Sequence, residues 1–238
     1  MIRWVTGFLD TPSRVAEPFW LAVTGSSVSP RRGPGGAFAT LVPERGDAYL
    51  RFQVVGDGPA RAHLDLHVDD VGAAAREVTG RGAVVTHAED GLVVLRSPAG
   101  VAFCLVRWDG ERELPARRAS LVDQLCVDIP QAGYAAEANF WAAVTGWQRR
   151  ASDLPQFEVL QSPPALPLRL LLQRTGGERA GVHVDFACQD VAVEVARHVE
   201  LGAVVVRRVP GQWTTLRDPA GREYCVTARP VPGFVGGG

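Results

Sequence analysis

The sequence predicts an α+β protein made of two copies of one domain, each copy containing two βαβββ modules. One observation is an internal repeat, in which FWLAVTG at 19–25 returns as FWAAVTG at 140–146. The other is the order of expected elements in each copy, which runs strand, helix, then two or three strands, twice over. This order favours antiparallel-rich sheets with helices on one face.

Two further blocks repeat in the same order along the chain. HLDL at 63–66 returns as HVDF at 183–186, and RSPAGVAFC at 96–104 returns as RDPAGREYC at 217–225. The two copies of each block lie 120 or 121 residues apart, which indicates a tandem duplication.

The charged, proline-containing stretch DGERELPARRAS separates the two copies. Its composition is typical of a linker between domains. The domain boundaries expected are a first domain at 1–110, a linker at 111–118, a second domain at 119–230 and a flexible tail at 231–238.

Local patterns predict the elements of the first copy in order. Gly25 suits the left-handed end of a first helix, Asp69 or Asp70 suits the start of a second, and Gly82 its end. The loop SPRRGPGG at 29–36 has too many prolines and glycines for a regular element and is expected to form a mobile lip. Strands are expected at 5–9, 37–42, 49–55, 61–68, 84–86, 92–96 and 102–106.

The second copy repeats this pattern, with helices expected near 134–145 and 190–201. The second of these helices ends before Gly202, which corresponds to Gly82 of the first copy.

Composition excludes several classes of partner. The formal net charge of −1 provides no general attraction to nucleic acid or to a membrane surface. No segment resembles a signal peptide or a membrane span, and the four cysteines form no CxxC pair. We therefore expect a cytoplasmic protein, monomeric or homodimeric, whose partner is a small molecule.

One strand face of each copy carries titratable groups. Residues two apart on a strand share a face, so His63, Asp65 and His67 lie together, as do His183 and Asp185. An imidazole beside a carboxylate suits proton transfer, because the carboxylate orients the ring and raises its basicity. The alternatives are that this face is simply exposed to water or that the pairs are structural.

The repeated blocks resemble the vicinal oxygen chelate superfamily, which includes glyoxalases, bleomycin-resistance proteins and extradiol dioxygenases. The motifs FW…G, HxDL and DPxGxxxC are similar to those of its glyoxalase-like branch, and the resemblance covers nearly the whole chain. It implies half-open, strongly curved mixed sheets with helices on the outer face. It is specific for the fold and not for a reaction.

The resemblance also implies positions for metal ligands. Metal-dependent members hold their ion with residues of the first, fourth, fifth and last strands. The first copy has Thr6, Gln53, His63 and Cys104 at these positions, and the second has Gln124, Gln173, His183 and Cys225.

Neither set contains a carboxylate, although hard divalent ions prefer anionic oxygen ligands. We therefore expect no cofactor. The alternative is a divalent metal on His183, Gln124, Gln173 and Cys225. Asp65 and Asp185 could complete a site only by turning toward it, which the spacing leaves open.

Four other side chains carry specific expectations. Trp20 and Trp141 are expected in the core, because each follows a phenylalanine at helical spacing. Cys104 and Cys225 could be nucleophiles, although small buried thiols more often serve packing.

The leading functional hypothesis is an enzyme of lyase, isomerase or hydrolase type that uses His and Asp on a small oxygenated metabolite. The alternatives are a binding protein that sequesters a drug or metabolite, as in bleomycin resistance, and a metal-dependent glyoxalase or dioxygenase. The catalytic candidates are His183, Asp185, His63 and Asp65. The ligand-binding candidates are Gln124, Gln173, Cys225, Trp213, Gln53, His67 and Cys104. The second copy is expected to hold the better-formed pocket.

Overall fold

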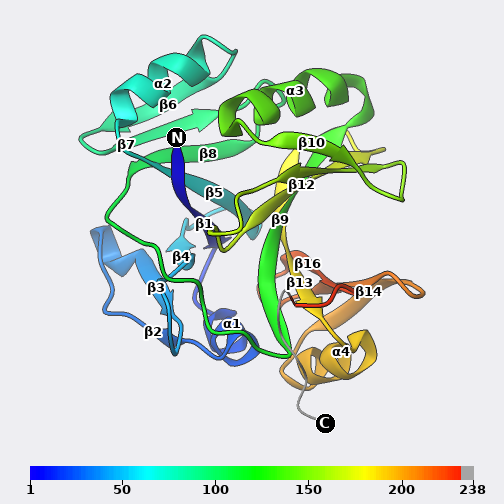
Figure 1. The fold of residues 1–238 in the computed structure, drawn as a ribbon. Helices are drawn as coiled ribbons and strands as arrows, with labels where there is room; N and C mark the ends of the chain where they lie inside the picture. The colour runs from blue at the N-terminus through cyan, green and yellow to red at the C-terminus, as the bar shows by residue number, and fades with distance from the viewer. Residues whose placement is uncertain (232–238) are drawn as a thin grey trace. The chain divides into compact units, whose positions relative to one another are not determined.

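The structure is a computed structural model that describes residues 1–231 (Figure 1). It contains four βαβββ modules in sequence, which confirms the predicted fold class. The first module comprises β1 (Ile2–Thr11), α1 (Glu17–Thr24), β2 (Ser27–Val28), β3 (Phe38–Val42) and β4 (Leu50–Val54). The second comprises β5 (Arg61–Val68), α2 (Val71–Thr79), β6 (Val84–Glu89), β7 (Leu92–Arg96) and β8 (Ala102–Arg107).

The second copy repeats the same order of elements. Its first module comprises β9 (Ser120–Pro130), α3 (Tyr134–Thr145), β10 (Gln148–Ala151), β11 (Phe157–Gln161) and β12 (Arg169–Thr175). Its second comprises β13 (Gly181–Cys188), α4 (Val191–Glu200), β14 (Val204–Val209), β15 (Trp213–Arg217) and β16 (Glu223–Thr227). Val231 is buried, and the remainder of the predicted tail, 232–238, lies outside the described residues.

The strands form two eight-stranded mixed sheets of equivalent topology. Their orders are β2-β3-β4-β1-β5-β8-β7-β6 and β10-β11-β12-β9-β13-β16-β15-β14. In each sheet the central pair, β5 with β8 or β13 with β16, is parallel, whereas the outer pairs are antiparallel. Each order begins and ends on different strands, so neither sheet closes into a barrel.

Helix ends follow the expected local chemistry. Gly25 ends α1 in the left-handed conformation, with φ of 62°, which a residue without Cβ adopts readily. The carboxylates of Asp70 and Asp190 accept hydrogen bonds from the first backbone N–H groups of α2 and α4. None of the helices in the described part of the chain has the length and apolar character needed to cross a membrane.

The loop at 29–36 is more ordered than its composition suggested. Pro34–Gly36 forms a short 3-10 turn, and Arg32 makes an isolated β-bridge with Phe38. Arg14 donates to the carbonyl oxygens of Gly35 and Gly36, both at 3.2 Å. The expectation of no regular element is therefore wrong, because an arginine outside the loop satisfies the carbonyl groups of the turn.

Internal contacts group the chain into two compact units. Unit 1 contains 1–7, 63–112 and 125–182, and unit 2 contains 8–62, 113–124 and the described residues from 183 onward. Each unit therefore combines the second module of one copy with the first module of the other. The sequential domain boundaries remain a prediction.

Aromatic side chains form the core of each unit. In unit 1, Phe103 of β8 packs against Phe140 and Trp141 of α3, with ring centroids 6.0 and 5.1 Å apart. In unit 2, Trp20 of α1 stacks on Phe186 of β13 at 6.1 Å. Trp20 and Trp141 are fully buried, which confirms their predicted place in the core.

Both buried indoles donate to a carboxylate, but the carboxylates come from different elements. Trp20 Nε1 donates to Asp218 Oδ2 at 2.7 Å, and Asp218 belongs to the DPAG turn before β16. Ser97 stands at the equivalent position before β8 and cannot supply this charge. Trp141 Nε1 instead donates to Glu137 Oε1 of its own helix, also at 2.7 Å.

A buried arginine accompanies Asp218 in unit 2. Arg222 donates to Asp218 Oδ2 at 2.7 Å and to the carbonyl oxygens of Arg61 and Asp10. The equivalent residue in unit 1 is Val101, which is buried and apolar. The turn before the last strand thus holds a buried ion pair in unit 2 and uncharged side chains in unit 1.

The linker at 111–118 contains neither helix nor strand but is held in place. Glu113 N donates to Asp47 Oδ2 at 2.8 Å, and Asp47 N donates to the carbonyl oxygen of Glu113 at 2.8 Å. Gly46 allows this approach, because a Cβ at that position would lie 2.3 Å from the carbonyl oxygen of Leu114.

Candidate functional site

Strand β5 places three titratable side chains on one face in unit 1. His63, Asp65 and His67 alternate with the apolar residues of the strand, as predicted. All three are buried, with exposed fractions of 8, 3 and 1%. The alternative that this face is simply open to water is therefore wrong for β5.

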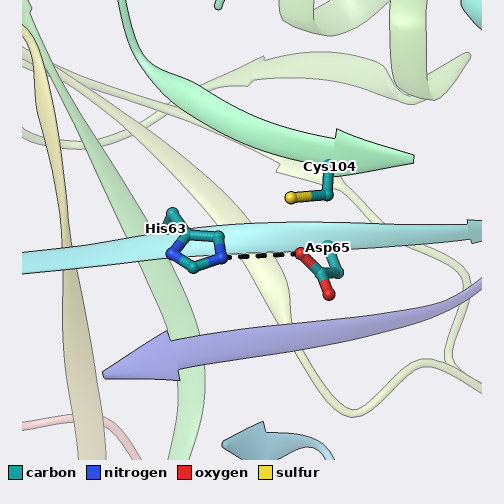
Figure 2. Close-up of side chains that lie close together, drawn as sticks. All are labelled: His63, Asp65 and Cys104. Carbon is teal, nitrogen blue, oxygen red and sulfur yellow. Dashed lines mark ion pairs between the residues drawn. The ribbon is translucent and has the colours of Figure 1, made fainter. Parts of the chain in front are cut away.

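His63, Asp65 and Cys104 form a compact cluster (Figure 2). Cys104 lies on β8, where parallel pairing places its Cα opposite that of Asp65. One ligand atom of each residue lies within 4.8 Å of the other two. The His63 Nε2 to Asp65 Oδ1 distance is 3.6 Å, which is longer than a hydrogen bond.

This cluster fits a metal ion better than the sequence suggested. A nitrogen and an oxygen bound to one tetrahedral Zn²⁺ lie roughly 3.4 Å apart, close to the observed separation. Zn²⁺ accepts imidazole, carboxylate and thiolate together, whereas the iron site of many oxygenases uses two histidines and a carboxylate. The sequence left open whether Asp65 could turn toward the inferred ligand positions. The structure places Asp65 beside His63 of the same strand and opposite Cys104 of β8.

His67 makes a hydrogen bond and an ion-pair contact in unit 1, apart from the cluster with Cys104. Its Nε2 lies 2.8 Å from Thr6 Oγ1 of β1, and its Nδ1 lies 3.4 Å from Glu111 Oε1 of the linker. Thr6 and His67, both singled out from the sequence, are thus paired with each other. Glu111 was missed, because nothing in the local sequence links it to a residue 44 positions earlier.

The second copy keeps the imidazole, carboxylate and thiol in unit 2. His183 Nε2 lies 3.3 Å from Asp185 Oδ1 and 3.9 Å from Cys225 Sγ. Gln124 Nε2 donates to the other carboxylate oxygen, Asp185 Oδ2, at 2.5 Å. Four residues predicted from the sequence therefore lie together, and Gln124 holds one oxygen of Asp185.

Three other predicted residues are placed by the strands that carry them. Gln53 lies on β4 in unit 2, and Gln173 lies on β12 in unit 1, where its Oε1 is 3.5 Å from Cys126 Sγ. Trp213 begins β15, and the guanidinium of Arg207 lies 5.9 Å from its ring centroid. Their roles in ligand binding remain predictions.

A buried polar network in unit 2 was not predicted. Glu194 Oε1 lies 2.9 Å from His198 Nε2, and His198 Nδ1 lies 2.9 Å from the Tyr224 hydroxyl. Burial opposes the charge of Glu194, but hydrogen bonds from His198, Arg197 and Ser120 outweigh it and lower its pKa to about 2. Burial lowers the pKa of His198, despite the carboxylate beside it. The Glu-x-x-x-His spacing on one helix was the available signal.

All four cysteines are buried and free of disulfide bonds. Burial, with the charges of Glu194 and Asp190, raises the pKa of Cys188 to about 12, so this thiol stays protonated at neutral pH. A nucleophilic role for Cys104 or Cys225 remains a prediction.

The fold and the match of one family model to both copies place this chain, as a tandem protein, in the vicinal oxygen chelate superfamily. The family model described as glyoxalase-like domain matches residues 8–106 and again 124–227. The chain therefore belongs to the glyoxalase-like domain family, with two tandem copies. A search of curated proteins found no match.

Solved structures with the same fold include two named as dioxygenases and one named as a synthase. A 2,2',3-trihydroxybiphenyl 1,2-dioxygenase from Sphingomonas wittichii is 15% identical, with a TM-score of 0.63 over 99% of this chain and 93% of that one. A 2,3-dioxygenase from Pseudomonas is 14% identical, with a TM-score of 0.64 over 97% and 94%. A variant of 4-hydroxymandelate synthase from Streptomyces coelicolor is 15% identical, with a TM-score of 0.60 over 96% and 93%. Such identities establish the fold and not the activity.

Proposed function

We propose that this protein is a metal-assisted enzyme that acts on a small oxygenated organic molecule. The observation that carries the proposal is the His63, Asp65 and Cys104 cluster, whose three ligand atoms lie within 4.8 Å of one another. The similarity to enzymes named as dioxygenases supports metal-assisted chemistry more than the metal-free chemistry expected from the sequence.

The donor set favours zinc over iron as the ion. His63 supplies one imidazole, Asp65 one carboxylate and Cys104 one thiolate, whereas a two-histidine iron site needs a second imidazole. A bound zinc ion would act as a Lewis acid that polarises a carbonyl or hydroxyl oxygen of the substrate. Lyase or isomerase chemistry of glyoxalase type needs such a Lewis acid and a base that accepts the proton, but no oxidant, so we favour it over ring cleavage.

Metal binding is tested with the full-length protein after removal of metal by dialysis. Titration with Co²⁺, a spectroscopic substitute for Zn²⁺, should give one equivalent of binding and a thiolate charge-transfer band. The band should disappear in Cys104→Ser, and affinity should fall at least tenfold in His63→Ala. Arg81→Leu, on an exposed turn, should behave as wild type.

Failure to bind Co²⁺ or Zn²⁺ stoichiometrically would overturn the metal assignment. Binding of carbonyl and hydroxy-acid compounds without turnover, in a panel screen of the metal-loaded protein, would instead indicate a sequestering protein. The screen thus separates the enzyme from the non-catalytic alternative.

The second copy supports a second candidate function, proton transfer without metal. Gln124 fixes one oxygen of Asp185, and the other lies 3.3 Å from His183 Nε2. A carboxylate held in this way would orient the imidazole as a general base. Activity that persists in metal-free protein and is lost in His183→Ala would favour this function.

A further inference from the structure

Two arginines of unit 2 lie beside each other on the β3 and β4 part of the sheet. Arg51 of β4 is the direct antiparallel partner of Thr40 of β3, so their side chains share a face. Arg32, from the loop before β3, donates from Nη1 to Thr40 Oγ1 at 3.1 Å. Thr40 therefore binds Arg32 directly and pairs with Arg51 across the two strands, and the charge of Arg51 acts on Arg32.

Neither guanidinium has a carboxylate within ion-pair distance among residues 1–231. The neighbouring Arg31 differs, because it is paired with Glu17. The Nε–H of Arg51 is buried and has no hydrogen-bond partner within the described chain. A buried donor of this kind is costly unless something accepts its hydrogen bond.

The electrostatics of the pair agree with this geometry. Partial burial and then the charge of Arg51 lower the pKa of Arg32. The guanidinium of Arg51 lies 5.8 Å from the ring centroid of Phe8, which shields one side of it from water. Two uncompensated cations on a partly desolvated surface attract an anion strongly.

The duplicated copy supplies an internal comparison. The β3–β4 and β11–β12 pairs have the same register, since Phe38 faces Gln53 in the first and Phe157 faces Gln173 in the second. The next pair on the same face, two residues further along, is Thr40 with Arg51 in the first copy. The corresponding pair in the second copy is Val159 with Leu171. This face therefore carries a cation in the first copy and apolar side chains in the second. Since the second copy forms the same strand pair without the arginine, the fold does not require Arg51.

We infer that Arg32, Arg51 and Thr40 form a binding site for an anionic group, a carboxylate or phosphate carried by a small molecule. Two guanidinium groups offer several N–H donors in fixed planes, which suits the oxygens of either anion. The inference concerns unit 2 alone and does not depend on metal binding by His63, Asp65 and Cys104.

The site is tested by calorimetry on the full chain in buffer freed of metal with a chelating resin. The probes are inorganic phosphate, benzoate as a carboxylate, and benzyl alcohol as the uncharged control. Phosphate or benzoate should bind saturably at one equivalent, and benzyl alcohol should bind at least tenfold more weakly. Whichever anion binds more tightly identifies the chemical group recognised.

Arg51→Leu, which introduces the residue of the second copy, should weaken anion binding at least tenfold. Arg32→Leu, on the surface loop, should also weaken anion binding. This variant tests the site if Arg51→Leu does not fold. The matched control Arg81→Leu, which removes an exposed arginine outside the site, should bind the anion as wild type does. Unchanged affinity in both site variants, no saturable binding of either anion, or equal binding of benzyl alcohol would overturn the inference.

Discussion

The two copies keep the same imidazole, carboxylate and thiol but differ in what surrounds them. In the first copy Thr6 bonds to His67 and leaves Asp65 to the cluster with His63 and Cys104. In the second copy Gln124 occupies the position of Thr6 and donates to Asp185. Two differences, Gln124 for Thr6 and Ala187 for His67, accompany this change in hydrogen bonding. The duplicated copies thus keep the three side chains and differ in the partners of those side chains.

The two copies also differ in the buried residues at the turn before the last strand and on the second helix. Asp218 and Arg222 form a buried ion pair in unit 2 where unit 1 has Ser97 and Val101. Glu194 and His198 on α4 correspond to Ala74 and Val78 on α2. Unit 2 therefore depends on buried charges at positions where unit 1 uses small or apolar residues.

The largest loss of stability is expected for Arg222→Val, which introduces the residue of the first copy. It leaves the buried carboxylate of Asp218 without its cation and should cost about 3–5 kcal/mol. Urea denaturation measures this cost. The double variant with Asp218→Ser should lose less than the single variant, and an equal or larger loss would contradict the assigned role of the pair.

His183→Ala should lower activity on any substrate that the second copy processes by about 100-fold or more, because the imidazole is the proposed general base. The melting temperature should change little. The pH–rate profile should lose its acidic limb, because a general base works only when it is deprotonated. A large drop in melting temperature with unchanged turnover would show that His183 has a structural role instead.

His67→Ala, which introduces the Ala187 of the second copy, should cost about 1–3 kcal/mol. It removes the partner of the buried Thr6 hydroxyl and of Glu111. The double variant Thr6→Val with His67→Ala should recover part of the loss in the same denaturation assay. Additive losses would indicate that the two side chains are not coupled.

The smallest effect is expected in the pH dependence of stability. The pKa of Glu194 is lowered to about 2, so its contribution is present above pH 4.5 and is lost as the pH falls toward 2. The pKa of His198 is lowered in the folded protein, so as the pH falls this histidine is protonated in the unfolded chain before it is protonated in the folded one. Stability therefore also declines below about pH 6.5. Glu194→Ala with His198→Val, which reproduces α2, should flatten the profile measured by denaturation from pH 7.5 to 3. An unchanged slope would contradict this account.

Sequence patterns predicted the modules because each pattern is local. Gly25 and Asp70 mark helix ends through their own backbone or side-chain chemistry, and alternation along β5 assigns His63 and Asp65 to one face. The predicted strand 61–68 and helix 134–145 agree with the structure at both ends.

Four βαβββ modules, their duplication and the residue types at the candidate sites could thus be predicted from local patterns. Which of these side chains meet depends on how the whole chain folds. Parallel pairing of β5 with β8 brings Asp65 opposite Cys104, and chain folding brings Glu111 to His67. These contacts join residues far apart in the chain, so they depend on strand register and helix packing, which short-range patterns do not encode. The two indole contacts show both cases, because Glu137 bonds to Trp141 four residues away on one helix, whereas Asp218 reaches Trp20 only in the folded chain.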